Sequence, residues 1–124
     1  MSMGGVRYTL PGRDYHAAEV FELERERVFF RSWFYAGRVD SLAEPGAFVA
    51  VDVVGGSILL VRGKDGELRG FYNVCRHRGS RLCDEESTGQ LRSAIKCPYH
   101  AWSYAFDGRL IGTPFVPDVP RCPG

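Results

Sequence analysis

Two stretches decide the fold of this chain: YNVCRHRGSRLC at 72–83 and CPYHAWSYAFDGRL at 97–110. Each stretch holds one cysteine and one histidine close together, as C-x-H in the first and as C-x-x-H in the second. The paired residues are Cys75 with His77 and Cys97 with His100. The whole chain has 4 cysteines and 3 histidines, so this pairing takes up half of the cysteines and two of the three histidines.

Both pairs fall at places where the backbone can turn sharply. Gly79 follows the first pair, Pro98 lies inside the second, and predicted strands flank both. We therefore expect two loops at one end of a β-structure, which can close over a bound metal from both sides.

Two thiolates and two imidazoles can bind either zinc or an iron–sulfur cluster. In structural zinc sites cysteine usually pairs with cysteine, and histidine with histidine. Here each loop supplies one of each, which suits a Rieske centre, where two cysteines bind one iron and two histidines bind the other. We predict a [2Fe–2S] cluster held by Cys75, His77, Cys97 and His100, with a structural zinc site as the alternative.

The bulk composition is that of an ordinary globular domain, with 44% hydrophobic and 25% charged residues. A net charge of +1 gives no electrostatic case for nucleic acid or an anionic membrane surface. No apolar run approaches the roughly 20 residues of a membrane span, and residues 1–10 lack the apolar stretch of a secretory signal. We therefore expect a cytoplasmic protein, in which cysteines serve metal binding rather than disulfides.

The pattern around the two loops is mostly β. Val49, Val51 and Val53 alternate with other residues as in a half-buried strand, and Gly55-Gly56 offers a turn into a second strand at 57–62. Further turns at 64–66 and 107–108 separate short strands at 67–72, 101–106 and 109–111. Short strands joined by Gly-based turns predict an antiparallel barrel or sandwich. Together with the cluster predicted above, this implies a Rieske-type fold with the two loops as a cluster-binding subdomain.

The predicted organisation has three parts. Residues 1–33 form a leader with one helix at about 16–32, where helix formers predominate and Gly and Pro are absent. Residues 34–112 form the cluster domain, with its loops at about 75–81 and 97–104, and residues 113–124 form a Pro-rich linker.

The stretches at 72–83 and 97–110, together with FELERERVFFRSWFYAGRVDSLAEPGAF at 21–48, resemble the Rieske domain of ring-hydroxylating oxygenase α subunits. The resemblance covers residues 15 to 120, and it departs at Ala101, where the family usually has Gly. A stand-alone Rieske ferredoxin is the alternative. Ferredoxins usually lack the Arg-rich CRHRG loop and the N-terminal helix, which favours the oxygenase family.

The resemblance implies an electron relay inside an O₂- and NAD(P)H-dependent monooxygenase or dioxygenase. In the family, a ferredoxin or flavin-dependent reductase reduces the cluster. The electron then crosses to a neighbouring α subunit of a trimer, where a mononuclear Fe(II) in the C-terminal catalytic domain activates O₂. Two histidines and a carboxylate bind that iron, and no histidine follows His100. We therefore expect the catalytic residues outside this chain, which alone would only transfer electrons.

Several residues around the cluster also receive expected roles. Arg78, with Arg76 and Arg81, is expected to form a docking patch for the electron donor or a neighbouring domain. Trp102 is expected to shield the cluster from water. Tyr104 has two interpretations, a hydroxyl offered to a cysteine sulfur as in relatives, or a tyrosine of the barrel core.

The loops also predict a low reduction potential. Respiratory Rieske proteins carry an extra cysteine in each loop and a serine two residues after the second histidine. Ser80, Tyr99 and Trp102 occupy those positions here. Fewer hydrogen bonds to sulfur leave the charge of the reduced cluster less stabilised, so we expect the lower part of the roughly −150 to +300 mV Rieske range.

Overall fold

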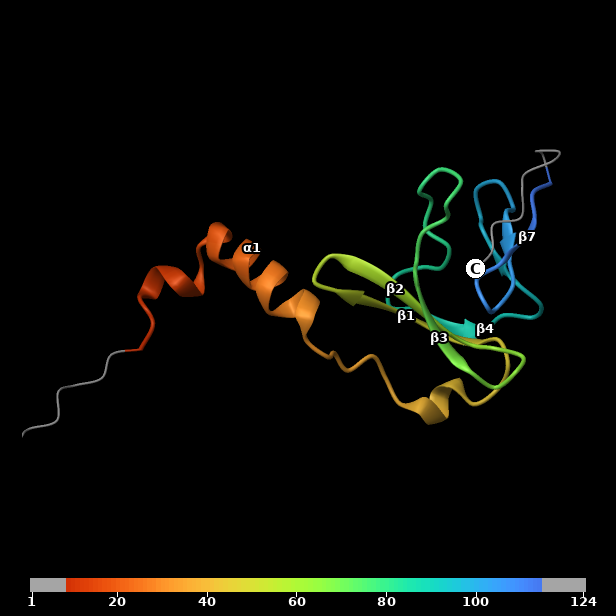
Figure 1. Ribbon diagram of the computed structural model, residues 1–124, viewed down its shortest axis with the longest axis horizontal. Helices are drawn as coiled ribbons and strands as arrows, with labels where there is room; N and C mark the ends of the chain where they lie inside the picture. The colour runs from red at the N-terminus through yellow and green to blue at the C-terminus, as the bar shows by residue number, and fades with distance from the viewer. Residues whose placement is uncertain (1–8, 115–124) are drawn as a thin grey trace, which may run out of the picture. The chain divides into compact units, whose positions relative to one another are not determined.

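The computed structural model describes residues 9–114, which fall into two units that divide between Phe34 and Tyr35 (Figure 1). Within this described range, no helix has the length and apolar character needed to cross a membrane. Apart from Thr113 and Pro114, the predicted linker 113–124 lies outside the described residues.

The first unit carries the predicted helix, but the helix is shorter than the expected 16–32. A 3₁₀ turn at Gly12–Tyr15 precedes α1, which spans Ala18–Arg27 and includes a 2.9 Å ion pair between Glu22 and Arg25. The α-helix ends where the sequence turns to β-branched and aromatic residues with lower helix propensity, and a 3₁₀ turn follows at Phe29–Arg31.

The second unit begins with a 3₁₀ turn at Val39–Leu42 and then builds a four-stranded antiparallel sheet. Its strands are β1 (Ala47–Val53), β2 (Gly56–Arg62), β3 (Leu68–Tyr72) and β4 (Thr88–Gln90), in the order β3-β2-β1-β4. The first three strands follow the predicted pattern. Val53 pairs with Gly56, so the turn is Val54–Gly55 rather than the expected Gly55-Gly56. No pattern predicted β4, since three residues give no periodicity.

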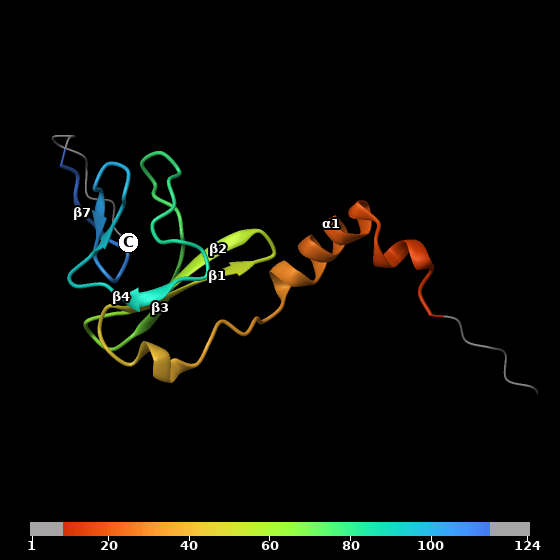
Figure 2. The ribbon, with the colours of Figure 1, turned by 180° about the vertical axis from the view of Figure 1, so that it is seen from behind.

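A second antiparallel sheet contains β5 (Ile95–Lys96), β6 (Ser103–Tyr104) and β7 (Leu110–Gly112), in that order. The predicted Asp107-Gly108 turn joins β6 to β7. A Cβ on Gly108 would lie 2.8 Å from the Phe71 ring of β3, so only glycine allows this close approach. The mostly β, antiparallel fold with one N-terminal α-helix is therefore confirmed, and Figures 1 and 2 show the two sheets of the second unit.

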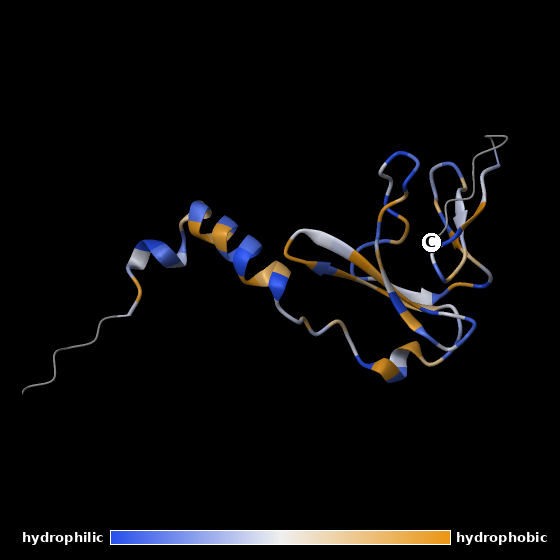
Figure 3. Ribbon diagram, viewed as in Figure 1, coloured by the Kyte–Doolittle hydropathy of each residue, from blue (hydrophilic) through white to orange (hydrophobic). Residues whose placement is uncertain are grey.

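The buried core of the second unit includes the cysteines of both loops. It contains residues of both sheets: Ala50, Leu59, Val61, Cys75, Ile95, Cys97, Tyr104 and Phe106. In contrast, the tip of the loop at 75–81 is hydrophilic (Figure 3). Both loops thus begin at buried thiols and extend toward solvent.

Candidate metal centre

The first loop leaves β3 and returns through a tight hydrogen-bonded turn. The Cys75 N–H donates to the Ser80 carbonyl at 2.7 Å, and the Gly79 N–H donates to the Cys75 carbonyl at 2.9 Å. Gly79 has a φ of +70°, which reverses the chain at the end of the turn. His77 lies within the turn, two residues after the cysteine.

The second loop repeats this backbone. The Cys97 N–H donates to the Trp102 carbonyl at 2.8 Å, and the Ala101 N–H donates to the Cys97 carbonyl at 3.0 Å. Ala101 has a φ of +58° and thus takes the place that Gly79 has in the first loop. The departure from the usual Gly at Ala101 therefore has a conformational cost, because an alanine in this conformation is strained.

The two loop cysteines are buried, reduced thiols. Cys75 is 1% exposed and Cys97 is 3% exposed. Burial by itself raises the pKa of Cys97, but backbone N–H groups of Tyr99 and His100 outweigh it and bring the pKa below its usual value. The second loop is therefore built to stabilise a thiolate.

Cys83 has the opposite surroundings. Burial, with a further contribution from Asp84, raises the pKa of its thiol. Cys83 thus favours the protonated state and fits the role of a packing residue at the edge of the core.

Tyr104 lies in β6 with its hydroxyl between the two loops. The hydroxyl oxygen is 3.2 Å from Cys75 Sγ and accepts the Arg76 N–H at 3.2 Å. Burial, then the Cys75 sulfur, raises the pKa of Tyr104, so its proton is kept for donation to sulfur. Tyr104 is also part of the core, so its position is compatible with both of the roles expected from the sequence.

The two loop histidines come together at the outer end of the loops. The rings of His77 and His100 lie 5.0 Å apart in an edge-to-face arrangement. Nδ1 of His100 is buried and has no hydrogen-bond partner. A buried polar atom without a partner is costly, so this nitrogen is suited to bind a ligand.

An aromatic ring covers each of these histidines. Trp102 stacks on His77 with centroids 4.6 Å apart and planes 9° from parallel, which joins the second loop to the first. Tyr99 lies against His100 at 3.8 Å and is 59% exposed. Trp102 therefore orients a histidine in addition to its expected shielding role.

The three loop arginines do not behave alike. Arg81 forms an ion pair with Glu85, four residues further on. Arg76 and Arg78 are exposed, and within residues 9–114 neither takes part in an ion pair. The docking patch expected of these three arginines therefore contains one residue, Arg81, whose charge is already paired within the chain.

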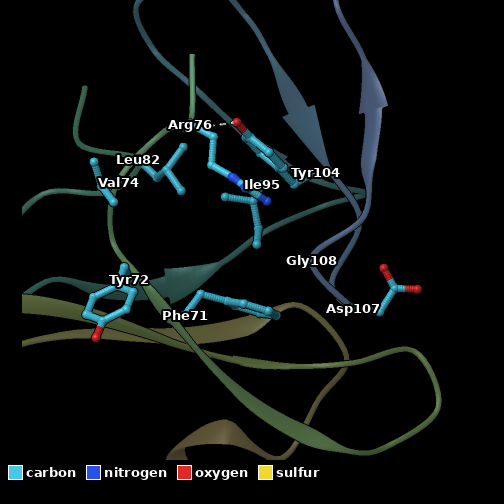
Figure 4. A pocket seen from close by; sticks show the side chains of 9 residues that line it. All are labelled: Phe71, Tyr72, Val74, Arg76, Leu82, Ile95, Tyr104, Asp107 and Gly108. Carbon is cyan, nitrogen blue, oxygen red and sulfur yellow. Dashed lines mark hydrogen bonds between the residues drawn. The ribbon is translucent and has the colours of Figure 1, made fainter. Parts of the chain in front are cut away.

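A mainly apolar cavity of about 390 Å³ opens beside Tyr104 (Figure 4). Its lining residues are Phe71, Tyr72, Val74, Arg76, Leu82, Ile95, Tyr104, Asp107 and Gly108. None of the four loop cysteines and histidines is among them, so this cavity is distinct from the cluster of thiols and imidazoles.

The donor set fits a two-iron cluster better than a single ion. Among the described residues, no three His, Cys, Asp or Glu side chains gather as they would around one metal ion. A Rieske cluster needs only two protein ligands on each iron. Two buried thiols and two paired imidazoles, one of them with an unpartnered Nδ1, meet that requirement.

Comparison with known proteins identifies the family. The Rieske [2Fe-2S] domain profile matches residues 32–123. The chain belongs to the Rieske [2Fe–2S] domain family. A structural zinc site, the alternative left open by the sequence, is not the cofactor of this family.

The relatives of this Rieske domain include oxygenase subunits. The carnitine monooxygenase oxygenase subunit of Acinetobacter baumannii is 42% identical over 105 residues, 85% of this chain and 28% of the relative. The biphenyl dioxygenase α subunit of Metapseudomonas furukawaii is 40% identical over 106 residues, 86% of this chain and 23% of the relative. This Rieske domain therefore spans about a quarter of the length of these relatives.

Solved structures agree with the sequence comparison. A quaternary ammonium Rieske monooxygenase, studied for carnitine oxidation and inter-subunit electron transfer, matches with a TM-score of 0.83 and 38% identity over 91% of this chain and 31% of that one. Naphthalene 1,2-dioxygenase from Rhodococcus sp. matches with a TM-score of 0.72 and 37% identity over 78% of this chain and 22% of that one. The Rieske fold of this domain is thus shared with both oxygenase types.

Sequence reasoning missed two residues of the Rieske loops. Tyr99 was considered only as the position of an absent disulfide cysteine, and its contact with His100 depends on the turn geometry. Asn73 has its side chain buried at the base of the first loop. Its signal is an asparagine two residues before Cys75, which composition alone does not distinguish from a turn residue.

The matching loops of this Rieske domain predict opposite effects for two reciprocal substitutions. Ala101→Gly should raise the free energy of unfolding by about 1 kcal/mol, because it removes the left-handed strain of an alanine. Gly79→Ala should lower it by about 1 kcal/mol or more for the same reason, since nothing lies within 4 Å of the added Cβ. Urea denaturation of the cluster-free chain measures both changes. Effects of the same sign would show that the loops are not equivalent.

Proposed function

We propose that Cys75, His77, Cys97 and His100 hold the Rieske [2Fe–2S] cluster. The observation that carries this proposal is the unpartnered, buried Nδ1 of His100, whose ring lies beside that of His77, in a site whose two loops also carry buried thiols. Each loop then contributes one thiolate to one iron and one imidazole to the other.

The surrounding residues have separable tasks in this proposal. The cluster, when bound, supplies transfer of one electron at a time. The Tyr104 hydroxyl donates to the Cys75 sulfur, and the N–H groups of Tyr99 and His100 stabilise the Cys97 thiolate. The Trp102 ring holds His77 in its orientation and excludes water from that side.

We further infer that this domain serves an oxygenase as an electron relay. The relatives reported above are oxygenase subunits rather than ferredoxins, and both monooxygenases and dioxygenases occur among them. A ferredoxin or flavin-dependent reductase would supply electrons. A mononuclear Fe(II) in the C-terminal catalytic domain of a neighbouring α subunit, in a trimer, would receive them. Cysteines that serve metal binding rather than disulfides suit the cytoplasm as the compartment.

The exposed Arg76 and Arg78 support a docking role in this relay. Both extend from the loop that carries His77, and neither has an ion-pair partner within residues 9–114. Exposed guanidinium groups on the loop that carries His77 would attract acidic groups on the electron donor or on the neighbouring catalytic domain.

The chain offers matched controls for testing the ligands. Cys75→Ser, Cys97→Ser, His77→Ala and His100→Ala should each abolish the visible absorption of the oxidised cluster and the EPR signal of the reduced cluster. Cys83→Ser and His16→Ala remove the same residue types at other positions and should leave both signals in place.

Iron and sulfide content, with circular dichroism to verify folding, completes this comparison. A variant of Cys75, His77, Cys97 or His100 that retained the normal spectrum would contradict the ligand assignment. Loss of the cluster in the Cys83 control would do so as well.

The gene sequence beyond codon 124 distinguishes a domain of an oxygenase α subunit from a stand-alone ferredoxin. We expect a downstream coding region with two histidines and a carboxylate as ligands of a mononuclear iron. A stop codon soon after Gly124 in the native gene would favour the ferredoxin instead.

A further inference from the structure

Asn73 occupies an unusual position at the base of the first ligand loop. It follows β3 directly and precedes Cys75 by two residues. At 3% exposure it is the only buried residue with a fully polar side chain in the described part of the chain. A buried amide is stable only when its donors and acceptor are paired, so its partners show what it holds together.

The amide group of Asn73 binds the backbone of Cys83 in both directions. Nδ2 donates to the Cys83 carbonyl at 2.7 Å, and Oδ1 accepts the Cys83 N–H at 2.9 Å. The second Nδ2 hydrogen goes to Ser57 Oγ at 3.0 Å, and the Asn73 backbone N–H donates to the Ser57 carbonyl at 2.9 Å. The side chain therefore acts as a peptide group would in a strand, and it joins β2, the start of the loop and its end.

The two loops differ in what closes their bases. The second loop is the connection of a β-hairpin, in which Ile95 pairs with Tyr104 and Lys96 with Ser103. The first loop has only an isolated bridge between Val74 and Arg81. The hydrogen bonds between Asn73 and Cys83 close the first loop again, further from its tip than that bridge. At the corresponding place the second loop has the paired strands β5 and β6.

We propose that Asn73 is a positioning residue for the cluster. Its amide fixes the ends of the segment 73–83, so that Cys75 and His77 face Cys97 and His100 at the separation a two-iron cluster requires. This inference rests on the ligand assignment proposed above.

Asn73→Leu tests the proposal, because leucine fills a similar volume but leaves the Cys83 N–H and carbonyl without partners. We expect the cluster of the reconstituted chain to be lost to an iron chelator about tenfold faster than in the wild type. We also expect a broadened EPR signal of the reduced cluster, which reports altered ligand geometry.

Two control variants separate this role from general packing. Ser57→Ala removes one hydrogen bond of Asn73 but keeps both bonds to Cys83, so its cluster should be released within about twofold of the wild-type rate. Leu42→Ala weakens a buried site outside the core cluster that contains Cys75 and Cys97. It should lower the melting temperature without broadening the EPR signal.

The proposal is overturned if Asn73→Leu lowers the melting temperature but releases its cluster at the wild-type rate with an unchanged EPR signal. Should Asn73→Leu fail to fold, hydrogen exchange of the wild-type Cys83 amide decides instead. Protection comparable to that of β2 supports the positioning role of Asn73, and exchange as fast as in an open loop refutes it. Failure of the ligand assignment is distinguishable, because it would show in the cysteine and histidine variants whatever Asn73 does.

Discussion

The hydrogen bonds that close the two ligand loops are the constraint on which the site depends. In each loop the cysteine N–H is bound by the carbonyl five residues later, and its carbonyl accepts an N–H from the residue four positions later. Each closed turn keeps its cysteine in the core while its histidine reaches the outer end. The two turns have the same hydrogen bonds, although the histidine is the second residue after the cysteine in one loop and the third in the other. A thiol pair and an imidazole pair result from two short peptide segments.

Electrostatics and packing complete what these turns begin. Cys97 is biased toward the thiolate by backbone N–H groups, whereas the buried Cys83 thiol is biased toward protonation. Cys97 and Cys83 thus differ in their surroundings, because backbone N–H groups donate to the first thiol and burial dominates at the second. Trp102 connects the loops through His77, and Tyr104 connects β6 to Cys75.

The cofactor type and most of the strands could be predicted from the sequence because they depend on local patterns. One cysteine and one histidine in each loop already indicated the cluster type, and alternation with Gly-based turns indicated β1, β2, β3 and the β6–β7 hairpin. The short strands β4 and β5 were not predictable, because pairing with distant residues defines them. The strain at Ala101 and the hydrogen bonds between Asn73 and Cys83 depend on backbone geometry that only the folded chain reveals. The predicted helix is longer than the observed one, because weaker helix propensity is the main sequence signal for its end at Arg27.

The central claim is that each loop gives one thiolate and one imidazole to a single cluster. Pulsed EPR of the reduced chain, prepared with natural and with ¹⁵N-labelled histidine, tests it most directly. We predict couplings from two histidine nitrogens that change with the label, that are lost together with the cluster in His77→Ala and His100→Ala, and that persist in His16→Ala. A reduced cluster without histidine nitrogen couplings, or with couplings that depend on His16, would contradict the account.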